Sequence, residues 1–137
     1  MMNEIHYLNT DLELAGPDDL KPLAVALGAP KRLLLLSTSQ REDGSWFIGL
    51  ETSTDHDGPE EPIREFLDAV EHLSPEAQAM WHACSSRDLN IGFECGTHPK
   101  ELSHGLSQST LQSLAAHGLA LRITLYPSTP GPLSESS

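Results

Sequence analysis

The sequence predicts an α+β fold, a ferredoxin-like β-α-β-β-α-β sandwich with an added C-terminal helix and strand and a mainly antiparallel sheet. Three observations support this prediction. Hydrophobic residues recur with the period of a strand or a helix in that order, and the last strand ends at Tyr126. A tight-turn sequence, Asp43-Gly44, separates two of the strands. The chain of 137 residues has the length of one domain, which can bury a core without a disulfide or a metal.

The N-terminal segment is predicted to form a strand followed by a helix. Residues 7–14 alternate between apolar and polar types, which is typical of a half-buried strand, and the alternation places Tyr7 on the polar face. Pro17 and the two aspartates after it suit the first turn of a helix, where acids complement the positive end of the dipole. Leucines and alanines then follow at helical spacing up to residue 27.

The next two elements are predicted to form a β-hairpin. Its strands are residues 32–38 and 45–54, on either side of the Asp43-Gly44 turn. The four consecutive leucines 33–36 predict a strand that is buried on both faces. Because the ferredoxin-like topology places this strand at an edge, we expect either the added helix or a partner to cover its second face.

The C-terminal half is predicted to contain three helices and two strands. An acidic stretch leads into a helix over residues 60–73, and a serine–proline pair begins a second helix that extends to residue 84. Residues 89–95 alternate and form the fourth strand. After a loop, Ser107 can cap another helix, and residues 119–126 form the last strand.

The composition predicts one domain in a reducing compartment. Residues 1–126 are expected to form the domain, and residues 127–137, rich in proline and serine, a disordered tail. We expect neither a signal peptide nor a membrane span, since the chain has no basic start followed by an apolar run and no long apolar stretch. The two cysteines then indicate reduced thiols and a cytoplasmic location. No cofactor is expected.

Charge restricts the kind of partner. The 20 acidic and 8 basic residues give a net charge of -12, which repels nucleic acid and anionic lipid and favours a basic protein partner. The alternative is an acidic surface that only keeps the protein soluble. The candidate steering charges are Glu60, Glu61, Glu65 and Asp68, and the candidate aromatic anchors are Tyr7, Phe47 and Tyr126.

Three segments carry a resemblance to known proteins. They are the acidic helix start after the first strand, the turn Asp43-Gly44-Ser45-Trp46, and residues 106–118 leading into the strand that ends at Tyr126. In these segments the chain resembles a family of uncharacterised small bacterial domains of unknown function, some of which look like immunity proteins of toxin systems. The resemblance spans residues 8–126 and implies a bacterial, intracellular, single-domain binding protein. It transfers no catalytic residue.

Two cysteines and two histidines, His82, Cys84, Cys95 and His98, are the weak candidates for a metal site. Cys95 and His98 have the short spacing of a zinc half-site. His82 and Cys84, however, point about 200° apart on a helix and cannot both ligate one ion. The apolar neighbours of both cysteines favour their interpretation as small buried hydrophobic residues. We therefore predict no metal site.

The loop after the fourth strand offers a catalytic alternative. His98 or His104 would act with Cys95, Glu94 or Glu101 as nucleophile or base. The sequence supplies no obvious oxyanion hole or orienting third group. We therefore expect a non-enzymatic, immunity-like inhibitor of a basic toxin or enzyme. The two alternatives are a small hydrolase or metal-dependent enzyme that uses this loop, and a structural homodimer formed through the open sheet face or the leucine-rich second strand.

Overall fold

The computed structural model describes residues 4–28, 33–97 and 100–128. His98 and most of the predicted tail, residues 129–137, lie outside the described residues. Within these ranges the predicted order of strands and helices is confirmed. The elements are β1 (His6–Gly16), α1 (Lys21–Gly28), β2 (Leu33–Gln40), β3 (Trp46–Thr52), α2 (Glu60–Glu71), α3 (Pro75–Ala83), β4 (Ser86–Glu94), α4 (Gln108–Ala116) and β5 (Ala120–Tyr126).

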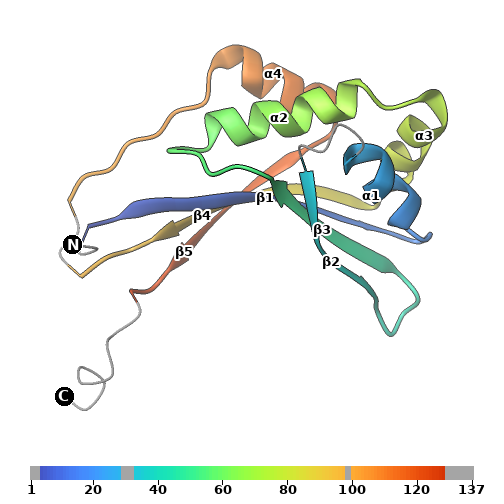
Figure 1. Ribbon diagram of the computed structural model, residues 1–137, viewed down its shortest axis with the longest axis horizontal. Helices are drawn as coiled ribbons and strands as arrows, with labels where there is room; N and C mark the ends of the chain where they lie inside the picture. The colour runs from blue at the N-terminus through green and yellow to red at the C-terminus, as the bar shows by residue number, and fades with distance from the viewer. Residues whose placement is uncertain (1–3, 29–32, 98–99, 129–137) are drawn as a thin grey trace.

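The strands form one mixed sheet in the order β2-β3-β1-β4-β5. The central strand β1 pairs antiparallel with β3 and with β4, and β2 pairs antiparallel with β3. β5 pairs parallel with β4, because α4 returns the chain to the same end of the sheet. In the part of the chain that the structure describes, the fold is therefore α+β, with four helices on one side of the sheet (Figure 1).

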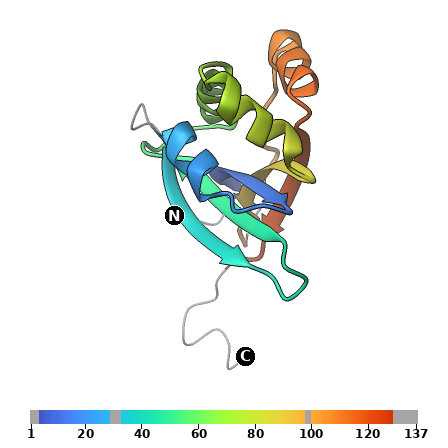
Figure 2. The ribbon, with the colours of Figure 1, turned by 90° about the vertical axis from the view of Figure 1, so that its right-hand side faces the viewer.

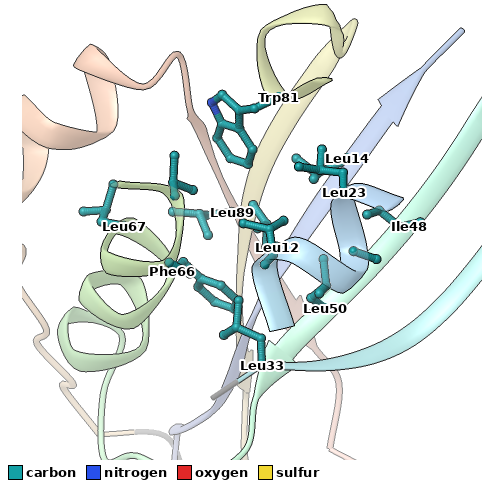
Figure 3. Packing of buried hydrophobic residues seen from close by; sticks show 14 of the residues in the cluster. Leu12, Leu14, Leu23, Leu33, Ile48, Leu50, Phe66, Leu67, Trp81 and Leu89 are labelled. Carbon is teal, nitrogen blue, oxygen red and sulfur yellow. The ribbon is translucent and has the colours of Figure 1, made fainter. Parts of the chain in front are cut away.

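The helices lie against one face of the sheet (Figure 2). The core residues come from both layers and fill the space between them. Leu12 and Leu14 of β1 are fully buried, and Phe66 of α2 and Trp81 of α3 pack over the sheet (Figure 3). Burying each such side chain contributes roughly 1.5–3 kcal/mol. The predicted core residues of the second helix are confirmed as buried, namely Ile63, Phe66, Leu67, Val70 and Leu73.

Local hydrogen bonds fix the predicted turn and helix starts. Asp43 Oδ1 accepts hydrogen bonds from the backbone N (2.9 Å) and the Oγ (2.6 Å) of Ser45. Gly44 in this turn has a φ of 89°, a backbone conformation that favours glycine. The Oγ atoms of Ser74 and Ser107 each accept, at 3.2 Å, a hydrogen bond from the backbone N–H three residues further on. The predicted hairpin turn and serine caps are confirmed.

The prediction that the leucine run of β2 is buried on both faces is wrong. Of the four leucines only Leu33 is buried, whereas Leu34, Leu35 and Leu36 are 48%, 49% and 50% exposed. β2 lies at one edge of the sheet, and its outer face looks away from the helices (Figure 2). The added helix α4 contacts α2 instead of covering β2. The consecutive leucines therefore mark an exposed edge.

A register shift in β1 reverses the predicted orientation of Tyr7. The pairing with β4 is irregular between Tyr7 and Asn9, so that Leu8 forms a bulge and is 42% exposed. Tyr7 consequently points toward the core, where its hydroxyl lies 2.7 Å from Thr10 Oγ1. Its ring makes an edge contact with Phe93 at a centroid distance of 5.8 Å. The predicted placement of Tyr7 on the polar face is wrong.

Candidate functional site: the acidic face of the sheet

The face of the sheet that no described helix covers carries five carboxylates. Asp11 on β1 lies directly opposite Glu51 on β3. Glu13, two residues along β1, lies opposite Asp88 on β4, and Glu94 is located at the end of the same strand. Because alternate residues of a strand point to the same face, these side chains share one surface. We call this surface the acidic sheet face.

Asp11 is the electrostatic centre of the acidic sheet face. Burial, followed by the negative charges of Glu51 and Glu13, raises the pKa of Asp11 to about 6. Asn9 Nδ2 donates a hydrogen bond to Asp11 Oδ1 at 3.3 Å, which partly offsets the loss of water. The carboxylates are therefore close enough to disfavour one another's charge, and a cation at this position would be attracted by all three.

Few positive groups balance these charges. Arg122 is the only lysine or arginine that the described strands place on this face, and its Nη2 lies 3.6 Å from Asp88 Oδ2. Arg41, in the hairpin turn, lies over the ring of Phe47 at 5.2 Å from the ring centroid. Among the described residues, Arg122 contacts Asp88 and Arg41 contacts Phe47, and neither forms an ion pair with Asp11 or Glu51.

Aromatic rings border the acidic centre. A Cβ at Gly92 would lie 3.2 Å from Tyr126 Cε2, which shows that the Tyr126 ring lies over this glycine. Tyr126 is 44% exposed and, together with Leu8, Asp11 and Glu51, lines a shallow hollow of about 390 Å³. The lining of the hollow combines carboxylates with apolar side chains. Such a lining suits the aliphatic stem and charged end of a lysine or arginine.

Glu60, a predicted steering charge, forms hydrogen bonds inside the fold. Its carboxylate accepts hydrogen bonds from Ser107 N (3.0 Å), Ser107 Oγ (3.1 Å) and Thr110 Oγ1 (2.9 Å). The bond from the Ser107 backbone is the main cause of the lowered pKa of Glu60. Glu60 at the start of α2 thereby acts as an external cap for the start of α4.

The other predicted steering charges lie on the helical layer. Glu61 is exposed, Glu65 Oε2 lies 2.7 Å from His56 Nε2, and Asp68 Oδ1 lies 3.4 Å from His72 Nδ1. The helices cover one side of the sheet (Figure 2). The strand register places the predicted anchors Phe47 and Tyr126 on the other side. The structure therefore does not bring these charges and anchors into one surface.

The predicted zinc candidates have different environments. Cys84 is buried, its Sγ donates to Met80 O at 3.5 Å, and burial raises the pKa of its thiol. His82 is exposed on α3, and Cys95 directly follows β4. Among the residues that the structure describes, no group of three His, Cys, Asp or Glu side chains is arranged to hold a metal ion.

His104, the candidate catalytic histidine that lies within the described residues, packs against other rings. Its ring centroid lies 6.1 Å from that of Tyr7 and 5.8 Å from that of Phe93. A Cβ at Gly58 would lie 2.8 Å from His104 Nδ1, so the imidazole fills the space over this glycine. His104 thus joins the loop after β4 to the segment before α2.

A family model described as Domain of unknown function (DUF4279) matches residues 21–128. The chain belongs to this family. The DUF4279 match begins at α1 and extends past the end of β5, which confirms the predicted membership in a family of domains of unknown function. No curated protein and no solved structure matches the chain. None of the helices in the described residues is long and apolar enough to cross a membrane.

In this DUF4279 protein, alternation in the sequence puts Asp11, Glu13 and Glu94 on the polar faces of their strands, whereas Glu51 and Asp88 stay unassigned. Glu51 lies on the same face of its strand as Phe47, and Asp88 lies on the same face as Asn90. Alternation alone therefore assigns both carboxylates to the acidic sheet face, provided that it is known which face the helices leave uncovered. The direct opposition of Asp11 and Glu51 depends on the register between strands, which has no local signal in the sequence.

Proposed function

We propose that this DUF4279 protein is a bacterial, cytoplasmic, non-enzymatic inhibitor that binds a basic toxin or enzyme, in the manner of an immunity protein. The acidic sheet face is the contact surface. The observation that carries the proposal is the Asp11–Glu51 pair, in which two carboxylates face each other on an uncovered surface and a third, Glu13, lies beside them. A cation of the partner, placed between these carboxylates, would be attracted by each of them and would reduce their mutual repulsion.

In the proposed complex, electrostatic attraction brings the partner to the acidic sheet face, and apolar packing then holds it there. An approaching lysine or arginine stabilises the ionised form of Asp11, so that the pKa of Asp11 falls as the complex forms. The aliphatic part of the same side chain lies in the hollow beside Tyr126, and Phe47 provides further apolar surface at the hairpin end. Aromatic anchors next to charges supply the desolvated centre that a tight complex needs.

The carboxylates of α2 have a separate task in this mechanism. Glu61, Glu65 and Asp68 add to the negative field of the molecule, which speeds encounter with a basic protein at low ionic strength. They lie on the helical layer and make no contact with a partner held on the sheet. Their effect is therefore on the association rate.

The sheet order is consistent with the finer topology expected from the sequence. β2, β3, β1 and β4 are neighbours in that order, and all three of their pairings are antiparallel. This order supports a ferredoxin-like β-α-β-β-α-β unit to which α4 and β5 have been added. The addition leaves the outer face of the unit free for a partner.

The test compares two variants that remove equal charge from different sides. Asp11→Asn, Glu13→Gln and Glu51→Gln together neutralise the acidic sheet face, and Glu61→Gln, Glu65→Gln and Asp68→Asn together neutralise α2. Tagged wild type and both variants are used to capture proteins from the lysate of the source cell, and the captured partner is purified for kinetic measurements.

The sheet variant should lose the basic partner through faster dissociation. The helix variant should keep the same dissociation rate and associate more slowly at low salt. Since the sheet variant removes opposed like charges, it remains folded, and loss of binding cannot be ascribed to unfolding. The proposal fails if no basic protein is captured, or if both variants lose the partner equally.

A further inference from the structure

β5 is an edge strand whose apolar side chains remain uncovered. No strand lies beyond β5 in the sheet that the described residues form. Leu121, Ile123 and Leu125 are 42%, 65% and 62% exposed, although their register with Leu89, Ile91 and Phe93 places them on the helix side of the sheet. An edge strand with a row of exposed apolar residues is a template for pairing with another strand.

The two edges of the sheet differ in how they resist such pairing. β2 is interrupted by an irregularity between Leu35 and Ser37, and an irregular edge is a poor template for another strand. The register of β5 with β4 is regular from Ala120 to Tyr126. β5 also contains no proline and a single charge, Arg122, which lies 3.6 Å from Asp88 of its own sheet. The open edge is therefore that of β5.

Backbone hydrogen bonds show which residues of β5 face the free edge. The carbonyl of Tyr126 accepts a hydrogen bond from Cys95 N at 2.8 Å, so the backbone of Tyr126 is directed toward the β4 side. In a strand the backbone groups of alternate residues point to the same side. The N–H and C=O groups of Leu121, Ile123 and Leu125 consequently point away from β4. The apolar residues are thus also the residues whose backbone groups face the edge that the described residues leave open.

We propose that two copies of this chain pair antiparallel through β5, with Ile123 of each copy opposite Ile123 of the other. This register places Leu121 of each copy opposite Leu125 of the other. The three opposed pairs are hydrogen-bonded pairs, each with two backbone hydrogen bonds, so that about six new hydrogen bonds form. The exposed apolar side chains of both copies then form one continuous row. The sheet extends through both copies, and the acidic sheet face remains open.

Charge favours β5 over the acidic sheet face and the acidic start of α2 for this contact. Each copy carries a net charge of -12, whereas residues 119–128 contain no acid and one base. In the proposed register Arg122 lies opposite Thr124 of the second copy and diagonal to Tyr126, within reach of its ring. Two strongly negative molecules still repel each other at a distance. Salt should therefore strengthen the dimer, in contrast to the proposed complex with a basic protein.

The size of the interface sets the expected affinity. A strand of seven residues is about 24 Å long, and a sheet with its side chains is about 10 Å thick, so each copy buries about 240 Å² at the edge. This area is well below the roughly 800 Å² per partner of a stable complex. The dimer is accordingly a weak one, and its dissociation constant lies in the micromolar range or above.

Sedimentation velocity of the full chain tests the proposal. Wild type is measured from about 10 µM to 1 mM protein at low and at high salt, beside Ile123→Lys and a control, Leu34→Lys, on the other edge. Both substituted side chains are exposed, so both variants fold. For wild type and for the control we expect a fraction of dimer that rises with protein concentration and with salt. For Ile123→Lys we expect a monomer at all concentrations.

A second variant tests the register. Ile123→Cys in a Cys95→Ser background should form a disulfide dimer on oxidation, because the Cα atoms of an opposed pair are about 5.5 Å apart. Leu121→Cys in the same background should not. A wild type that stays monomeric at 1 mM and high salt overturns the proposal. Loss of the dimer in Leu34→Lys also overturns it, because the contact would then involve β2. Protection of the Leu121, Ile123 and Leu125 amides from hydrogen exchange in the monomer overturns it as well, because another segment would then occupy the edge of β5.

Discussion

Asp11 and Glu51 lie directly opposite each other on β1 and β3, and both carboxylates face the side of the sheet that the helices leave uncovered. Like charges in this position destabilise a sheet by roughly 0.2–1 kcal/mol. The fold therefore retains an unfavourable contact on its central strand. Under the proposed function this contact has a use, since the repulsion is removed when a cationic partner binds.

The raised pKa of Asp11 predicts how stability changes with pH. Its pKa is raised from 3.8 to about 6 in the folded protein, so the fold favours the protonated form. The contribution of Asp11 to stability is complete below pH 3.8 and is lost as the pH rises through about 6. Asp11→Asn should therefore gain stability relative to wild type between pH 4 and 6.5, by about 1–2 kcal/mol after allowance for solvent screening.

Urea unfolding of both proteins across this pH range measures the difference. Glu42→Gln, in the exposed hairpin turn, removes the same charge from the surface and is the matched control. A difference between Asp11→Asn and wild type that does not change with pH would show that Asp11 is not crowded by Glu51 and Glu13.

Glu60 should contribute to stability through α4. Glu60→Ala removes the acceptor for Ser107 N, Ser107 Oγ and Thr110 Oγ1, and hydrogen bonds to a charged group are individually strong. We expect a loss of about 1–2 kcal/mol in the free energy of unfolding at pH 7. Because the pKa of Glu60 is lowered in the fold, this contribution is present above its ordinary pKa and is lost as the pH falls.

The neighbouring variant Glu61→Ala serves as the control in the same helical turn. Its side chain is exposed, and we expect a change within about 0.5 kcal/mol. Hydrogen exchange adds a local measurement, since Glu60→Ala should raise the exchange rate of α4 amides more than that of β1 amides. Equal stability of the two variants would exclude the capping role.

The order of elements could be predicted because each segment carries its own period, and the turn at Asp43-Gly44 and the cap at Ser107 have local signatures. Contacts between distant segments could not. Glu60 and Ser107 are 47 residues apart, and neither sequence neighbourhood indicates the other. The bulge at Leu8 was missed because alternation was assumed to continue without interruption, and one extra residue reverses the face of everything before it.

The inward orientation of Tyr7 can be tested by a double-mutant cycle with Thr10. The two hydroxyl oxygens are 2.7 Å apart, and Thr10 is 2% exposed, so Tyr7→Phe leaves a buried hydroxyl without its partner. We expect Tyr7→Phe and Thr10→Val each to cost about 1–2 kcal/mol in urea unfolding. The double variant should cost less than the sum of the two, and additive losses would place the tyrosine elsewhere.

The leucine run of β2 allows a direct test of which side chains the core contains. Leu33 is 5% exposed and belongs to the core cluster, whereas Leu34, its neighbour in the chain, is 48% exposed on the outer face. Leu33→Ala should therefore lower the free energy of unfolding by about 2–4 kcal/mol through lost burial and a residual cavity. Leu34→Ala removes the same atoms from a half-exposed position and should cost less than about 1 kcal/mol. Equal, large losses in urea unfolding would mean that a second layer covers β2, as the sequence alone had suggested.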